Sequence, residues 1–288
     1  MITRSANPIN DLEVKNFLKS LSGEDLFSGD SPSPAGEYRD QFFKTFELWM
    51  GKKTHSKIIG ADLWTKYITE GATGAFLNFD IKYREKQTYV LKGEYPFHGM
   101  CGAKVIGNIE EISSQGKFII SYPFSATGEV HPDMEEVLSF CEKKNIPVMV
   151  DCALLNISKV ENFDINKYKC VEALTLSLSK SFSSGRFRTG VCFCREEWNQ
   201  APMAILNEWS YINHLNLNVH IRLMTNFGVD YVLNKYKPVQ LEICNSLGVK
   251  ESSCVLFGLS FDEKYKEFSR SGVINRLCLA NLLEKHFT

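Results

Sequence analysis

A lysine at the end of a predicted strand limits the possible folds of this chain most strongly. It lies within residues 173–195, which read ALTLSLSKSFSSGRFRTGVCFCR. Residues 173–178 form an apolar, partly alternating run that predicts a strand, and Lys180 follows it. Arg186 and Arg188 come soon after. Because an amine near fixed positive charges loses its proton more easily, Lys180 suits the role of a nucleophile. The alternative is a solvated basic loop.

An acid ends a second predicted strand earlier in the chain. Residues 119–154, IISYPFSATGEVHPDMEEVLSFCEKKNIPVMVDCAL, predict a strand, a glycine-containing turn, a helix and another strand. The last of these, residues 146–150, is apolar throughout, which is typical of a buried parallel strand. Asp151 follows it directly, and ligands bind at this end of strands in α/β sheets. The alternative is an aspartate that caps a following helix.

Two further stretches suggest sites for anions. Residues 70–76, EGATGAF, form a glycine-rich turn before a predicted helix. Its backbone N–H groups and the positive end of the helix dipole suit a phosphate, and Thr73 adds a hydroxyl. Arg276 lies inside the apolar run 273–280, where a cation needs an anionic partner. The alternative is an arginine that reaches solvent from an edge strand.

The remaining pattern alternates strands and helices. Apolar spacing and turn residues predict helices over 10–21, 37–50 and 133–144, one or two helices within 199–236 that end before Pro238, another helix over 238–247, strands over 88–91, 118–121, 191–194 and 254–261, and a loop over 28–36.

Composition excludes several function classes. The 288 residues are 44% hydrophobic and 23% charged with a net charge of −1, which is typical of a soluble globular protein without a nucleic-acid footprint. No apolar run is long enough for a membrane span or a signal peptide, so we expect a cytoplasmic protein. The nine cysteines lack a disulfide spacing, which predicts reduced thiols. Cys192 and Cys194 have no second pair nearby, so no metal site is expected.

Lys180 within Ser-x-Ser-Lys-x-Phe, Arg188 within Arg-Thr-Gly and the upstream Asp151 together resemble the fold-type I pyridoxal-phosphate enzymes, specifically the class I/II aminotransferases. The resemblance implies an α/β fold, with a three-layer α/β/α large domain on a mostly parallel sheet and a reduced small α+β domain.

The resemblance also implies the domain limits and the assembly. The chain is shorter than typical members. The large, cofactor-binding domain would span residues 26–237, and the small domain would combine residues 1–25 and 238–288. A homodimer is implied by analogy with the family.

The same resemblance assigns roles to individual residues. Lys180 would form a Schiff base with pyridoxal 5'-phosphate and then move a proton, while Asp151 would pair with the ring nitrogen. Arg276 would bind the substrate α-carboxylate. The cofactor-binding residues would be Ala72, Thr73, Tyr95, Ser125, Asp151, Ala153, Ser177, Lys180 and Arg188. Of these, Ala72, Thr73, Ser177 and Arg188 would hold the phosphate.

Two positions depart from the family pattern. Ser125 stands where relatives often have Asn, and Leu154 stands where many have Tyr. In the family, that Asn and that Tyr both form hydrogen bonds with the phenolic oxygen of the cofactor. Ala153 matches a small residue beneath the ring, and Tyr95 matches the aromatic residue that stacks on it.

The implied function is a pyridoxal-phosphate-dependent aminotransferase acting on an amino acid and a 2-oxo acid. Two alternatives remain open. One is a lyase or decarboxylase that uses the same cofactor, because the sequence does not show which Cα bond is broken. The other is a non-catalytic descendant of the fold.

Overall fold

A seven-stranded sheet forms the centre of the computed structural model, which describes residues 2–27, 37–270, 272 and 274–287. Its strand order is β2-β9-β8-β6-β5-β3-β4, and the neighbours run parallel except for β9, which is antiparallel to β2 and β8. The strands are β2 (Thr65–Thr69), β3 (Gln87–Leu91), β4 (Lys104–Ile106), β5 (Gly116–Ser121), β6 (Val148–Asp151), β8 (Val171–Ser177) and β9 (Gly190–Cys194).

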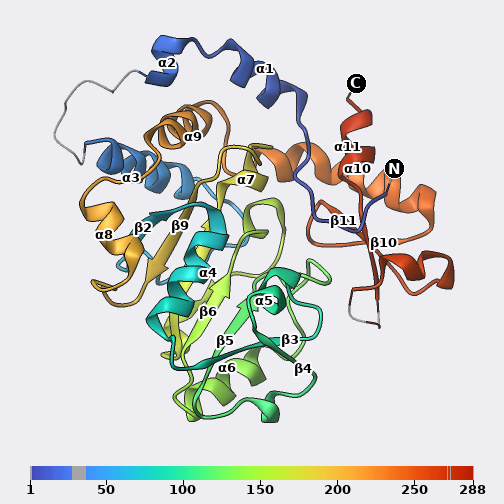
Figure 1. Cartoon of the computed structure of the whole chain (residues 1–288). Helices are drawn as coiled ribbons and strands as arrows, with labels where there is room; N and C mark the ends of the chain where they lie inside the picture. Colours follow the sequence, from blue (N-terminus) through green and yellow to red (C-terminus); the bar gives the residue numbers. More distant parts are fainter. Residues whose placement is uncertain (1, 28–36, 271, 273, 288) are drawn as a thin grey trace.

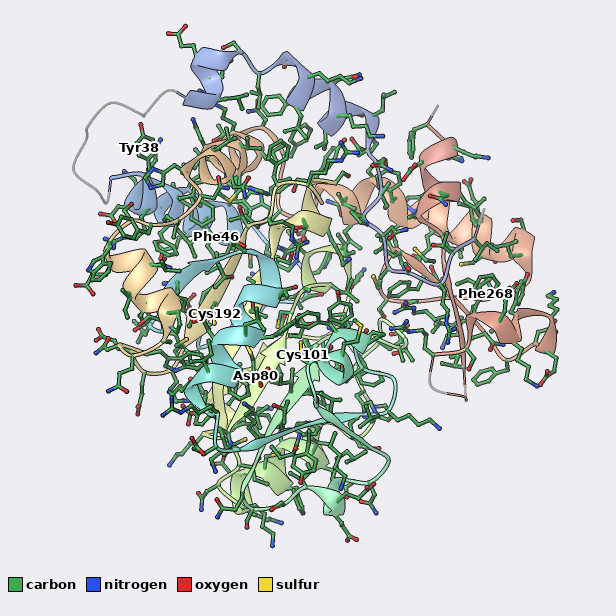
Figure 2. All side chains as sticks on the ribbon, viewed as in Figure 1. Tyr38, Phe46, Asp80, Cys101, Cys192 and Phe268 are labelled. Carbon is green, nitrogen blue, oxygen red and sulfur yellow. The ribbon has the colours of Figure 1, made fainter. Side chains whose placement is uncertain are left out.

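Helices cover both faces of this sheet. Side chains alternate along β5, so Phe118 and Ile120 enter one apolar core, while Ile119 enters another. Figure 2 shows side chains filling both sides, with Phe46 and Cys192 inside the fold. One core contains α3 (Glu37–Met50), α6 (Met134–Lys143) and α9 (His214–Asn226), and the other contains α4 (Gly71–Lys82) and α8 (Pro202–Glu208). The predicted three-layer α/β/α arrangement is confirmed, and burial on both faces explains the apolar strands.

A smaller part with its own core lies beside the sheet, next to both chain ends (Figure 1). Its three strands pair antiparallel in the order β10-β11-β12. The N-terminal segment joins it through a bridge between Thr3 and Cys278. Its elements are β10 (Lys250–Glu251), β11 (Phe257–Ser260), β12 (Asn275–Cys278), α10 (Tyr231–Leu247) and α11 (Ala280–Lys285). This is the expected small α+β unit; the domain limits themselves stay a prediction.

Short elements complete the chain. The remaining helices and strands are α1 (Leu12–Ser20), α2 (Gly23–Phe27), β1 (Ile58–Ile59), α5 (Pro96–Met100), β7 (Phe163–Asp164) and α7 (Leu178–Ser181). Asp11 caps α1 by accepting a hydrogen bond from the Val14 N–H at 2.9 Å. The predicted loop over 28–36 lies outside the described residues. Within the described residues, no helix is long and apolar enough to cross a membrane.

The predicted helix break at Pro238 was wrong. Pro238 lies inside α10, a single helix that runs through the predicted domain limit at residue 237. Proline removes one backbone hydrogen bond and costs about 3 kcal/mol in a helix interior. Apolar residues on both sides of it, including Leu233 and Val239, pack into the smaller core. That burial outweighs the local preference, which a sequence pattern alone does not reveal.

Candidate cofactor and substrate site

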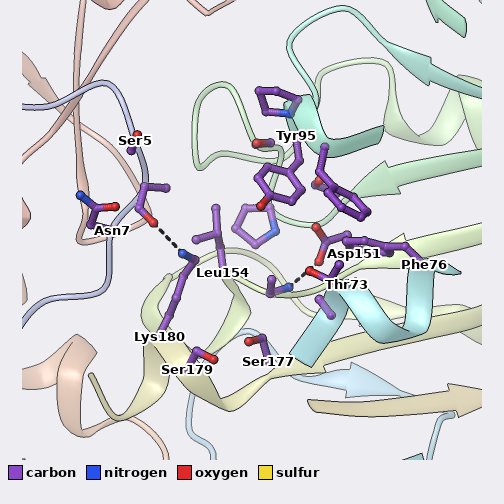
Figure 3. A pocket seen from close by; sticks show the side chains of 18 of the residues that line it. Ser5, Asn7, Thr73, Phe76, Tyr95, Asp151, Leu154, Ser177, Ser179 and Lys180 are labelled. Atoms are coloured by element: carbon purple, nitrogen blue, oxygen red, sulfur yellow. Dashed lines mark hydrogen bonds between the residues drawn. The ribbon is translucent and has the colours of Figure 1, made fainter. Parts of the chain in front are cut away.

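All ten predicted site residues line one cavity of about 410 Å³, the central cavity. Figure 3 labels Thr73, Tyr95, Asp151, Ser177 and Lys180 among them. Because β6 and β8 are parallel neighbours, their carboxyl ends bring Asp151 and Ser177 to the same edge of the sheet. The predicted residues in its lining are Ala72, Thr73, Tyr95, Ser125, Asp151, Ala153, Ser177, Lys180, Arg188 and Arg276.

Lys180 enters the central cavity from α7, one short turn beyond β8. Its Nζ donates a hydrogen bond of 2.6 Å to the carbonyl oxygen of Ala6. Burial lowers the pKa of the Lys180 amine, and Arg188 lowers it further, while Asp151 opposes the shift. The direction agrees with the prediction, but its main cause is burial. Arg186, the other predicted neighbour, is exposed and does not line the cavity.

Asp151 is a buried carboxylate with one short local contact. Its side chain is 7% exposed, and Oδ1 accepts a hydrogen bond from the Ala153 N–H at 2.9 Å. Burial raises the pKa of Asp151 to about 6, against the effects of that bond and of Lys180. A cationic group beside Asp151 would offset the cost of burying its charge.

Arg188 lies against the start of α4 because two glycines allow close contact there. A Cβ on Gly71 would lie 2.7 Å from Arg188 Nη2, and a Cβ on Gly190 would lie 2.7 Å from the Leu176 carbonyl oxygen. Gly71 also has φ of +67°, which favours glycine. These contacts fix the guanidinium beside the helix N-terminus.

These donors lie together in the cavity wall, and we call Ala72, Thr73, Ser177 and Arg188 the phosphate cradle, after the role that the sequence predicts for them. Arg188 Nη1 donates to Ser179 Oγ at 3.4 Å, and no ion pair holds its guanidinium among the described residues. A helix N-terminus, a guanidinium and hydroxyl groups together suit a phosphate monoester.

Tyr95, Leu154 and Ser125 complete the wall of the central cavity. Tyr95 is 43% exposed, and its ring stacks on Phe97 with the centroids 5.9 Å apart. Ser125 and Leu154 are buried at 8% and 7% exposure. Figure 3 shows the labelled Tyr95, Asp151 and Lys180 side chains around the same space.

Arg276 is almost fully buried in β12, at 1% exposure. Its Nη1 donates to the Ser125 carbonyl, its Nη2 donates to the Arg4 carbonyl at 2.9 Å, and its guanidinium lies 4.3 Å from the Phe257 ring centroid. Burial lowers the pKa of Arg276 to about 10. Among the described residues its partners are therefore carbonyl dipoles and a ring, not the anion that the sequence pattern required. Its Nε is buried without a hydrogen-bond partner.

Several cavity residues were not predicted from the sequence. Ser5, Ala6 and Asn7 bring the N-terminal segment against Lys180, and Arg270 is partly buried in the same wall. They lie more than 85 residues from Lys180 in the chain, so no local spacing could have identified them. Within the described chain, no group of three or more His, Cys, Asp or Glu side chains could hold a metal ion.

Comparisons with known proteins agree with this architecture. Residues 103–227 match the family described as aminotransferase class I and II. A search of curated proteins finds no match. Several solved structures share the fold over 98% of this chain. One is a pyridoxal-phosphate-bound C–S lyase from Staphylococcus hominis, which is 12% identical, is covered over 89% of its chain and has a TM-score of 0.68. Another is the N-succinyldiaminopimelate aminotransferase of Mycobacterium tuberculosis, which is 12% identical, is covered over 90% of its chain and has a TM-score of 0.67. A third is a variant of the Thermus thermophilus aspartate aminotransferase, which is 16% identical, is covered over 89% of its chain and has a TM-score of 0.65.

Proposed function

We propose that this chain, whose residues 103–227 match the aminotransferase class I and II family, is a pyridoxal-phosphate-dependent aminotransferase for an amino acid and a 2-oxo acid. The arrangement of the central cavity carries this proposal. It combines an amine of lowered pKa, Lys180, with a buried acid, Asp151, and with the guanidinium groups of Arg188 and Arg276. A site that only binds a neutral ligand has no need of these four groups together.

The residues of the cavity fit the cofactor. The phosphate cradle supplies a helix N-terminus and a guanidinium that forms no ion pair with an acid among the described residues. Asp151 supplies a buried carboxylate that a protonated ring nitrogen would neutralise. When bound, pyridoxal phosphate supplies an aldehyde that amines attack and a ring that accepts the electron pair released at the substrate Cα.

Lys180 and Asp151 would then determine where protons lie during the reaction. Lys180 Nζ, kept basic but less protonated than an exposed lysine, takes up the proton released at the substrate Cα. Asp151 would stay ionised beside a protonated ring nitrogen and would accept a hydrogen bond from it. For these roles Lys180 must leave the Ala6 carbonyl, which holds its amine here.

Arg276 would orient the substrate by its α-carboxylate. A carboxylate is a stronger acceptor than the two carbonyls that now hold the guanidinium, and its two oxygens match the arginine fork.

The test of this function is a single turnover with the cofactor-loaded protein. Mixing with a panel of amino acids should convert the cofactor into pyridoxamine phosphate and release the matching 2-oxo acid, both measured by chromatography. Release of pyruvate and ammonia from cysteine or serine would instead assign elimination, and release of CO2 would assign decarboxylation. A protein that never binds the cofactor would support the non-catalytic alternative.

Changing Arg188 to Gln should weaken pyridoxal phosphate binding about 10- to 100-fold, because a charge-assisted contact to the phosphate is lost. Arg186→Gln is the matched control, since Arg186 is exposed and outside the cavity, two positions away. Titration of the apoprotein with cofactor, followed by fluorescence, measures both affinities. Equal affinities in the two variants would argue against the phosphate cradle.

Changing Arg276 to Lys should lower kcat/KM for the amino acid by about 100-fold while leaving cofactor affinity nearly unchanged. Lysine keeps the charge but cannot form two parallel bonds to a carboxylate. Steady-state kinetics give the first quantity and cofactor titration gives the second. If kcat/KM and cofactor affinity fell together, Arg276 would only maintain the fold. An unchanged kcat/KM would also contradict a role in substrate binding.

A further inference from the structure

A second buried acid lies beside the central cavity. Glu94 precedes α5, and its side chain is 6% exposed. Its Oε1 accepts a hydrogen bond from the Ser121 N–H at 2.7 Å, and its Oε2 accepts from Ser121 Oγ and from the Tyr95 N–H at 3.2 Å. No salt bridge neutralises Glu94 among the described residues. A buried acid without a cation is costly, so its contacts call for a reason beyond packing.

The contacts of Glu94 reach two proposed cofactor residues. Ser121 ends β5 and lies directly opposite Asp151 in the parallel register with β6. The next residue, Tyr122, donates its N–H to the Asp151 carbonyl oxygen at 2.8 Å. On the other side, Glu94 accepts the N–H of Tyr95, and both Ser121 and Tyr95 line the cavity. One carboxyl group thus connects the strand end beside Asp151 with the backbone of Tyr95.

We propose that Glu94 is a positioning residue of the cofactor site, which fixes Asp151 and Tyr95 relative to each other and adds a second negative charge near the cofactor ring nitrogen. This inference rests on the proposed function, because it assigns the two flanking residues to the cofactor. Glu94 does not line the cavity itself and acts through Ser121 and Tyr95.

The electrostatics are consistent with such coupling. The groups that face Glu94 are Ser121 from β5, Tyr95 at the start of α5 and Asp151 from β6. Burial raises the pKa of Glu94 to about 7, and the charge of Asp151 raises it further, while the Ser121 contacts lower it. Near neutral pH Glu94 is therefore partly ionised. A cation at Asp151 would favour the ionised form of both acids.

The apoprotein gives a readout that does not depend on catalysis. An acid whose pKa is higher in the folded state stabilises that state when protonated, and this stabilisation is lost as pH rises through the folded value. The melting temperature of the wild-type apoprotein should therefore fall as pH rises from about 4.5, the ordinary pKa of a glutamate, to about 7, and it should level off above pH 7. The stabilisation by protonated Asp151, whose pKa is about 6, is lost at lower pH than that by Glu94. Glu94→Gln should remove the upper part of the decline.

The chain offers a matched control. Glu129 accepts hydrogen bonds from both the N–H, at 2.7 Å, and the Oγ of Ser253, in the same arrangement as Glu94 with Ser121, but it lies outside the central cavity. Glu129→Gln removes an equivalent contact and should leave the pH dependence and the cofactor affinity unchanged. Glu94→Gln should weaken pyridoxal phosphate binding about tenfold, because a bond to a charged group is lost.

The deciding experiment combines melting curves of the apoproteins from pH 4 to pH 8.5 with cofactor titrations of wild type, Glu94→Gln and Glu129→Gln. Ser121→Ala is the second variant, and it should move the decline to higher pH, since a bond that favours the ionised Glu94 is lost. The inference is overturned if the two glutamine variants have the same pH profile and the same cofactor affinity. Failure of the wild type to bind the cofactor would instead overturn the proposed function.

Discussion

Changing Lys180 to Ala should remove the visible absorbance band that the protein acquires with pyridoxal phosphate, and should lower amino-group transfer by at least about 1,000-fold. The covalent partner of the cofactor and the group that moves the Cα proton would be lost together, and general acid–base catalysis alone contributes about 100- to 10,000-fold. Lys180 is the one lysine in the described lining of the central cavity, so no neighbour could replace it.

The measurement is an absorbance titration, followed by borohydride reduction and mass spectrometry of the digested protein. In the wild type the added mass should lie on the peptide that contains Lys180. Lys167→Ala, at an exposed lysine outside the central cavity, should behave like the wild type. A reducible band that persists in Lys180→Ala would show that another lysine binds the cofactor.

Residual cofactor binding in Lys180→Ala would distinguish the affinity that the phosphate cradle supplies from the affinity that the covalent bond to Lys180 supplies. The phosphate cradle does not depend on the amine, because Arg188 is held by contacts to α4 and Ser179. We therefore expect this variant to bind the cofactor without the visible band. Loss of all binding would mean that the covalent bond, and not the cradle, supplies most of the affinity.

The sheet and its strand ends could be predicted because their signals are local. The buried strand before Asp151 is apolar at every position, since both of its faces are covered by helices. The helix over 37–50 was predicted with both of its ends, because its aromatic residues repeat at helical spacing. The family resemblance assigned Asp151 and Lys180 to one cofactor, and the parallel pairing of β6 with β8 agrees with that assignment, because the carboxyl ends of parallel strands meet at one edge of the sheet.

The contacts that complete the site were not predictable from local patterns. Ala6 reaches Lys180 from 174 residues earlier in the chain, and Arg4 holds Arg276 through a backbone carbonyl that any residue could supply. Glu94 reads as an ordinary polar residue in a turn, and only the packing of β5 beside it shows that it is buried. These features depend on tertiary structure, as does the unbroken helix at Pro238.

Changing Asp151 to Asn should reduce turnover by about 100- to 10,000-fold, although the amide oxygen keeps the hydrogen bond from the Ala153 N–H. Removing one partner of a buried charge pair costs about 3–5 kcal/mol, and a neutral amide no longer stabilises the protonated ring nitrogen. Single-turnover kinetics with saturating cofactor measure this loss. Turnover within about threefold of the wild type would contradict the assigned role of Asp151.

The same variant should be more stable than the wild type when both lack cofactor. Burial raises the pKa of Asp151 from an ordinary 3.8 to about 6, so the folded state is favoured by protonation and loses that advantage as pH rises between these values. Above pH 6 the ionised side chain then costs about 3 kcal/mol of folding free energy, which asparagine avoids. Denaturant unfolding of the two apoproteins at pH 7.5 and pH 4 should show the difference only at the higher pH. A residue that lowers stability when empty, yet is needed for turnover, has the properties expected of a group placed for a cationic cofactor, whereas a merely structural aspartate would lose stability on substitution at both pH values.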